Sequence, residues 1–293
     1  MLQCIMSVMR LFLIKILFIT ALSLVLTACG SLDSLGSLFG SSSDSSSSDD
    51  EYVGWDKQKF RNEAKAALDA GSYEKAVKLY EALQTRYPFG EGSAQNELDL
   101  AYAYYKADKY EESVAAAERF IKMNPRSQGI DYAYYLRGLA NFNRDLGFIN
   151  RYLPTDISQR DQSRAQTAYT NFEELITRFP NSKYVADAKQ RMTYLRNNMA
   201  MHEVHIARYY LKRSAYVAAA SRASGVVEKY QGTIAVPYAL QVMQEAYTNL
   251  GMNDLARDAA RVYEINYPNG PTVPEHSDAT MANKVWDFIG LDE

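Results

Sequence analysis

Very few side chains in this 293-residue sequence are of the types that carry covalent or metal chemistry. The chain contains 2 Cys and 3 His, too few for a disulfide framework or a structural zinc site. His202 and His205 stand at positions i and i+3 of a predicted helix with Glu203 between them, so both imidazoles could share one face, as in some metal sites. No third ligand accompanies them. We therefore expect no metal ion, no cofactor and no catalytic residue.

One cysteine stands where a modification is expected. Arg10 and Lys15 precede an apolar run of about a dozen residues that ends at Leu26, and a small-residue site follows, as is typical of a secretory signal. The run is shorter than the roughly 20 residues of a membrane-spanning helix, which is the alternative interpretation. The ending Leu-Thr-Ala-Cys is similar to a bacterial lipobox. It predicts an S-diacylglycerol and an N-acyl chain such as palmitate on Cys29.

The residues after Cys29 predict where the acylated protein resides. Gly30 occupies the second mature position and Ser31 follows it, whereas Asp at the second position tends to retain bacterial lipoproteins at the inner membrane. We therefore expect the periplasmic face of the outer membrane. Two or more acyl chains bind a bilayer stably. The chain up to Glu51 is mostly Ser, Gly and Asp, which predicts a disordered, flexible tether. The signal peptide is thus assigned to residues 1–28 and the lipidated linker to residues 29–54.

The composition is that of a soluble globular protein, with 47% apolar and 23% charged residues. The net charge of −3 and the pI of about 5.8 lack the basic excess of a nucleic-acid-binding protein, so we expect no nucleic-acid partner. Neither a phosphate-binding G-x-x-x-x-G-K-[ST] motif nor a G-x-S-x-G nucleophile motif occurs. The unusual feature is the presence of 23 Tyr.

From Trp55 onward the apolar residues have helical spacing, and the breaks between helices form a repeat. Five related segments end at Pro88, Pro125, Pro180, Gln231 and Pro268. At one fixed distance before these ends stand Gly71, Asp108, Ser163, Ser214 and Gly251. At a second fixed distance stand Ala76, Ser113, Ala168, Ala219 and Ala256. A preceding helix has its own small site at Ala64, Ala101, Gly138 and Ala207, whereas the fifth unit carries Gln244 there.

This is the pattern of tetratricopeptide repeats, in which small residues allow two antiparallel helices to cross closely. We predict an all-α, right-handed superhelical solenoid of about five such helix pairs over residues 55–269. Its N-terminal repeats would cover residues 55–180, its C-terminal repeats residues 181–269, and a tail would follow at residues 270–293.

Three segments do not fit the simple repeat. We expect an inserted loop from Gly147 to Asp161, and additional helix between Tyr184 and Met201 that elongates a first helix. Within the tail, the segment Lys284 to Leu291 alone has the spacing of a short amphipathic helix. Its role is left open.

The first helices of stacked repeats line one concave face, where most repeat proteins bind their partners. The predicted inward positions form an aromatic strip that consists of Leu98, Tyr102, Tyr105, Tyr132, Tyr135 and Phe142. Tyr offers a large, rigid contact surface at low entropic cost. With the basic Arg61 and Lys65 at one end, the strip would suit an extended peptide that bears aromatic side chains and a carboxylate. The alternative is that these tyrosines pack between repeats.

Longer stretches of the array resemble a known family. They read YPFG from Tyr87, LDLAYAYYKADKY from Leu98, IDYAYYLRGL from Ile130, FPNSKYVADAKQRM from Phe179 and ARYYLKRSAYVAAASR from Ala207. Together with the lipobox at Cys29, these motifs resemble the BamD family of outer-membrane assembly lipoproteins over roughly Trp55 to Asn269. The loop from Phe148 to Ile157 and the chain after Pro268 depart from the family.

The resemblance implies a non-enzymatic component of the β-barrel assembly (BAM) complex of Gram-negative bacteria. The N-terminal repeats would receive unfolded outer-membrane proteins through a C-terminal targeting segment, which would place the client on the aromatic strip. The C-terminal repeats would dock the periplasmic domains of BamA and help to hold the other BAM lipoproteins. The candidate charged contacts for this docking are Arg191, Arg196, Arg208 and Arg213. Each of these arginines could equally lie on a solvated helix face.

Two functions from other classes stay open on the residues alone, because a repeat fold serves many partners. One is a tetratricopeptide-repeat lipoprotein adaptor that recruits periplasmic cell-wall or division proteins. The other is a peptidoglycan hydrolase that uses the repeats as an appendage. No non-repeat segment of useful size remains to form such an enzyme.

Overall fold

The computed structural model describes residues 52–152, 158 and 161–271. The chain divides into two compact units, Met1–Gly54 and Trp55–Glu293, and the helices described below all belong to the second unit. The signal peptide, Cys29, most of the linker and nearly all of the tail lie outside the described residues. The expectations for those segments therefore stay predictions.

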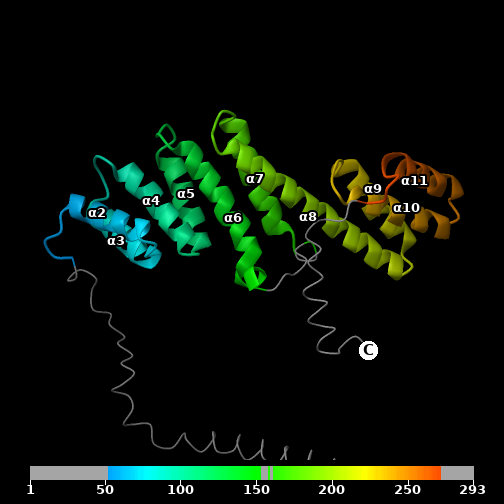
Figure 1. The fold of residues 1–293 in the computed structure, drawn as a ribbon, viewed down its shortest axis with the longest axis horizontal. Coiled ribbons are helices and arrows are strands. Elements are labelled where there is room, and N and C mark those ends of the chain that lie inside the picture. The colour runs from blue at the N-terminus through cyan, green and yellow to red at the C-terminus, as the bar shows by residue number, and fades with distance from the viewer. Residues whose placement is uncertain (1–51, 153–157, 159–160, 272–293) are drawn as a thin grey trace, which may run out of the picture. The chain divides into compact units, whose positions relative to one another are not determined.

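The described part of the second unit is helical and contains no strand (Figure 1). Its helices are α2 (Lys57–Asp69), α3 (Tyr73–Arg86), α4 (Ser93–Lys106), α5 (Tyr110–Met123), α6 (Ile130–Tyr152), α7 (Ser163–Arg178), α8 (Val185–Lys212), α9 (Tyr216–Lys229), α10 (Val236–Asn249) and α11 (Asn253–Asn266). Each helix packs against the next one in the chain, so the even-numbered helices are the first members of five pairs. First helices also touch across pairs, α4 with α6 and α8 with α10. The prediction of an all-α stack of about five tetratricopeptide-like helix pairs is confirmed.

The tight turns within pairs explain one set of aligned residues. Its members have positive φ angles, of 76°, 59°, 58° and 72° at Gly71, Asp108, Ser214 and Gly251. This left-handed conformation lets the next amide close the turn; for example, the amide of Ser72 donates to the carbonyl of Ala67 at 2.8 Å. The alignment of Ser163 with this set was wrong in structural terms. Ser163 begins α7, because an inserted segment replaces the tight turn there.

The small residues aligned in the sequence lie where the two helices of a pair cross. Those of the second helices are all buried, namely Ala76, Ser113, Ala168, Ala219 and Ala256. At one crossing the Ser113 hydroxyl donates to the carbonyl of Ala101 at 2.9 Å, which satisfies a buried polar group. Gln244, which aligns with Ala101 in the first helix of the fifth unit, is exposed. The turn of that unit is aligned correctly, because Gly251 has the left-handed conformation.

The two insertions have different outcomes. α8 runs for 28 residues, which confirms the elongated first helix predicted between Tyr184 and Met201. The loop predicted from Gly147 is wrong in its first part, because α6 continues to Tyr152. The apolar spacing of this segment is compatible with helix, and no Pro interrupts it before Pro154.

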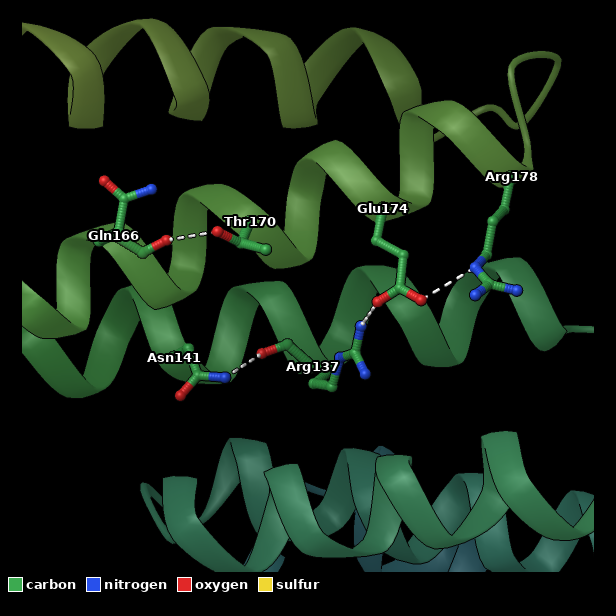
Figure 2. A network of polar contacts seen from close by, with 6 residues as sticks. All are labelled: Arg137, Asn141, Gln166, Thr170, Glu174 and Arg178. Atoms are coloured by element: carbon green, nitrogen blue, oxygen red, sulfur yellow. Dashed lines mark hydrogen bonds and ion pairs between the residues drawn. The ribbon is translucent and has the colours of Figure 1, made fainter.

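The third pair is held by ion pairs on the face of α6 that meets α7 (Figure 2). Glu174 lies between Arg137 and Arg178, and Arg178 Nε is 2.9 Å from a Glu174 carboxylate oxygen. Both guanidinium groups also lie over the ring of Tyr134, at 5.1 and 5.6 Å from its centroid. This cluster joins α6 to α7.

A glycine in the same pair sets how closely these helices approach. A Cβ atom built on Gly138 would lie 2.6 Å from Cε1 of the fully buried Phe172. Gly138→Ala should therefore lower the free energy of unfolding by about 1–3 kcal/mol, as overpacking does in other cores. Urea unfolding followed by circular dichroism measures it. The matched control is Gly225→Ala in α9, where a Cβ meets nothing within 4 Å and the helix should gain roughly 0.5–1 kcal/mol. Equal effects of the two changes would contradict the close approach.

Candidate functional site

Four tyrosines from three successive units meet on the side of the array formed by first helices. Tyr102 on α4 lies with its ring centroid 6.4 Å from that of Tyr132 on α6. Tyr132 is 6.5 Å from Tyr135 and 5.3 Å from Tyr184. Tyr135 and Tyr184 stack at 4.6 Å with their planes only 13° apart. We call these four residues the tyrosine cluster; each of them is half-buried, so part of each ring stays in contact with solvent.

Sequence reasoning placed three of these residues together and missed Tyr184. This residue precedes the first turn of α8 as its N-cap, so the inward positions of a helix did not include it. Its position in the sequence could have indicated this. Tyr184 stands in the short connection from α7 to α8, and such a connection ends beside the first helices. Lys183 extends the cluster with its Nζ 5.1 Å from the centroid of the Tyr184 ring.

A polar group borders the tyrosine cluster. The Tyr135 hydroxyl donates to Oδ2 of Asp187 at 2.6 Å, and Nε of Arg191 donates to the same oxygen at 2.6 Å. The Arg191 guanidinium also lies 5.0 Å from the ring centroid of Phe142. The tyrosine cluster thus lies beside the charged pair of Asp187 and Arg191. Together they suit a ligand that has both apolar side chains and backbone polar groups.

The surroundings of the site shift the pKa values of Tyr132, Tyr135 and Asp187. Burial, followed by the hydrogen bond to Asp187, raises the pKa of Tyr135 to about 12. Burial also raises the pKa of Tyr132 far above its usual value. At Asp187 burial acts in the opposite direction from the hydrogen bonds of Arg191 and Tyr135, and the hydrogen bonds prevail, so its pKa lies below the usual value. Tyr132 and Tyr135 are thus neutral near pH 7, and Asp187 is an anion.

The other predicted members of the aromatic strip lie deeper. Leu98 and Phe142 are 5% and 8% exposed and belong to hydrophobic core clusters, so they offer a ligand little surface. Tyr105 is half-buried, and its hydroxyl accepts a hydrogen bond from Nδ2 of Asn143 at 2.6 Å. Its ring lies 6.0 Å from that of Tyr110. Tyr105 therefore ties α4 to α6 beside the tyrosine cluster.

Of the two basic residues predicted at one end of the strip, Lys65 is exposed and Arg61 makes structural contacts. Nε of Arg61 donates to the side-chain oxygen of Asn96 at 3.1 Å, and Nη2 donates to the carbonyl of Glu91 at 3.2 Å. Lys57 donates to the same carbonyl at 2.7 Å. These bonds hold the first unit to the connection that leads into α4.

The four arginines chosen as docking contacts do not share one surface role. Arg191 belongs to the site just described. Arg196 donates to the carbonyl of Lys229 at 3.0 Å, close to the end of α9. Arg208 lies 5.1 Å from the ring centroid of Tyr238, and Arg213 lies 5.8 Å from that of Tyr209. Arg208 also lines a hollow between α8 and α10 together with Leu211, Lys212, Gln241, Val242 and Glu245.

The two histidines bind a residue of the inserted segment. His202 Nδ1 lies 2.6 Å from the carbonyl oxygen of Ser158, which requires this nitrogen to donate. His205 Nε2 lies 2.9 Å from the Ser158 hydroxyl. Within the described ranges, no group of three or more His, Cys, Asp or Glu side chains is placed to hold a metal ion. None of the helices that the structure describes is long and apolar enough to cross a membrane.

Comparisons with known proteins identify a family and several relatives. The family YfiO, described as "Outer membrane lipoprotein", matches residues 55–262. A protein of Neisseria meningitidis serogroup A named "Outer membrane protein assembly factor BamD" is 42% identical over 257 residues, which is 88% of this chain and 92% of the relative. The protein of that name from Neisseria gonorrhoeae is also 42% identical over 257 residues, with the same shares covered. The one from Xylella fastidiosa is 40% identical over 210 residues, 72% of each chain.

Proposed function

The chain belongs to the YfiO family of outer membrane lipoproteins, and from this membership we propose that it is an outer membrane protein assembly factor. It acts as a lipoprotein component of the BAM complex that binds unfolded outer-membrane proteins and supports their insertion. The relatives that carry this name cover most of the chain at 40–42% identity. The observation that carries the molecular part of the proposal is the partly exposed tyrosine cluster.

The tyrosine cluster suits an extended segment of an unfolded barrel protein. Such a barrel strand ends in alternating aromatic and apolar residues, so in extended form every second side chain points to the same side. Tyr102, Tyr132, Tyr135 and Tyr184 offer aromatic surface along three neighbouring units. Asp187 and Arg191 can meet the polar backbone or charges of the client. Sequence-tolerant recognition follows, because ring contacts read apolar surface rather than one particular side chain.

Binding of the client must be weak enough for release. A complex of nanomolar strength corresponds to about −12 kcal/mol and would trap the client, since no ATP is available in the periplasm to drive release. The half-buried tyrosine cluster is consistent with weak binding. Part of each ring packs within the protein, so only the exposed part of the ring can contact the client. Transfer then runs on differences in binding and folding free energy.

The role is non-enzymatic in this proposal. The only described imidazoles, which were the best candidates for chemistry, bind Ser158. At the tyrosine cluster, Tyr135, Asp187 and Arg191 are hydrogen-bonded to one another.

The last two units supply the proposed docking surface for the periplasmic domains of BamA and for the other lipoproteins of the complex. The hollow between α8 and α10 carries Arg208 and Lys212 beside the apolar Leu211 and Val242. Cations next to apolar surface suit a protein partner with exposed carboxylates. Arg213, which directly follows α8, lies close to this hollow in the chain. Arg208 and Arg213 contact aromatic rings of the chain, whereas Arg191 and Arg196 donate hydrogen bonds within it. We keep Arg208 and Arg213 as docking residues.

The proposed location is the periplasmic face of the outer membrane, with anchoring through lipid on Cys29. The lipobox-like ending of the signal and the family description support it. The proposal is tested by affinity purification of the tagged chain from detergent-solubilised membranes. We expect a barrel-forming BamA partner and the other BAM lipoproteins in stoichiometric amounts. Recovery of cell-wall or division proteins without a barrel-forming partner would instead support the adaptor function.

A further inference from the structure

The last helix of the array exposes an apolar face. On α11, the side chains of Leu255, Val262 and Ile265 are 41%, 40% and 71% exposed. They are spaced i, i+7 and i+10, so they lie along one side of the helix. The buried residues of α11 are Ala256 and Ala259, which lie beside this row rather than within it. We call the three exposed residues the terminal patch.

The corresponding positions of the other second helices are polar or small. Counted from the small residue at the helix crossing, they are Lys75, Ala82 and Thr85 in α3, Glu112, Arg119 and Lys122 in α5, Thr167, Glu174 and Thr177 in α7, and Ala218, Gly225 and Glu228 in α9. The repeat therefore does not require apolar residues there. Their presence in α11 is a property of the end of the array.

An apolar face at the end of a stack needs a covering group. Terminal repeats ordinarily present a polar outer face, because no further repeat buries them. Contiguous exposed apolar side chains mark a contact surface. The nearest chain that could supply the cover is the segment that directly follows α11, which continues for more than twenty residues to Glu293.

The sequence of that segment contains a matching apolar face. Between Lys284 and Leu291, a helical register places Val285, Trp286, Phe288 and Ile289 on one side and leaves Asp287 on the other. A helix of this length is not stable alone in water, where about 12–15 residues are marginal. It would form only against an apolar surface.

The connection is long enough for this contact. The residues between Pro271 and Lys284 can span up to about 45 Å at roughly 3.5 Å per residue. The whole of α11, at 14 residues and about 1.5 Å per residue, is roughly 21 Å long. Segment 284–291 can therefore reach any point of the terminal patch from the same chain.

We propose that segment 284–291 packs as a short amphipathic helix on the terminal patch of its own chain and closes the end of the array. A second copy of the chain or a different protein could occupy the same patch, and the experiment distinguishes these occupants. The proposal does not rest on the function proposed above.

Disulfide crosslinking tests the contact directly. The chain from residue 29 onward with Cys29→Ala contains no other cysteine, so Ile289→Cys can be combined in turn with Leu255→Cys, Val262→Cys and Ile265→Cys. We expect at least one of these pairs to form an intramolecular disulfide about tenfold faster than the control, because a docked segment has a high effective concentration. The control pairs Ile289→Cys with Glu228→Cys, the α9 equivalent of Ile265. Rates equal to the control in all three pairs, or a covalent dimer as the main product, would overturn the proposal.

A second experiment replaces the terminal patch by the polar residues that α5 has at the same positions. Leu255→Glu, Val262→Arg and Ile265→Lys together copy Glu112, Arg119 and Lys122 of α5 onto α11. The helical circular dichroism should be kept, while amide hydrogen exchange in segment 284–291 should become at least about tenfold faster than in the parent chain. Identical exchange of that segment in the two proteins would show that the terminal patch does not hold it.

Discussion

Replacing Tyr102 and Tyr135 together by Ala should weaken the binding of an extended aromatic peptide by roughly 30-fold. Aromatic residues at the centre of an interface typically contribute more than about 1 kcal/mol each, and about 1.4 kcal/mol corresponds to a tenfold change in affinity. Both rings are half-buried members of the tyrosine cluster. Fluorescence anisotropy with a labelled ten-residue peptide of alternating apolar and polar residues, ending in Phe, measures the change.

Two controls separate binding from folding in this experiment. Tyr209→Ala removes a tyrosine that is 56% exposed and lies outside the tyrosine cluster, so peptide affinity should not change. Tyr135→Phe keeps the ring stacked on Tyr184 and removes only the hydroxyl that donates to Asp187, so most of the affinity should remain. If the double variant lost its helical circular dichroism, or bound the peptide like the parent, the binding role of the tyrosine cluster would be wrong.

Cys29→Ala should transfer the protein from the membrane fraction to the soluble periplasmic fraction almost completely. The acyl chains on Cys29 would supply the membrane affinity, at about 0.8 kcal/mol for each buried CH₂ group. Fractionation of cells followed by immunoblotting measures the distribution.

The matched control for the anchor is the other cysteine. Cys4 lies within the segment predicted to be removed, so Cys4→Ala should leave the protein in the outer membrane. Mass spectrometry of the parent protein should find the acyl groups on Cys29. Retention of the Cys29→Ala protein in the membrane fraction would refute the lipid anchor and favour a different attachment.

The helix pairs could be derived from the sequence because their determinants are local and repeat. A small residue where two helices cross and a residue tolerant of positive φ in the turn recur at the same distances, as at Ala76 and Gly71. Ser163 shows the limit of that alignment. A matching distance from the end of the unit assigned it to a turn, although the chain before it is inserted and Ser163 begins a helix.

The sequence alone also determined that tyrosines of several first helices come together, because every unit repeats the same inward side. Which of the aromatic residues stay accessible depended on the neighbouring units. Phe142 is 8% exposed because it packs against Phe172 and Tyr194, which lie far from it in the chain. Tyr184 belongs to the cluster although it lies in a connection between helices. Helical periodicity does not apply there and could not predict its position.

The charged side chains were decided by tertiary structure in the same way. Arg191 and Arg208 both belong to α8, yet Arg191 lies over Phe142 of α6 and Arg208 lies over Tyr238 of α10. His202 and His205 share a face as their spacing predicted, but the partner on that face is Ser158 of the inserted segment. Helical spacing determines the direction in which a side chain points. What it meets there depends on the packing of units that are distant in the chain, and only the folded structure contains that information.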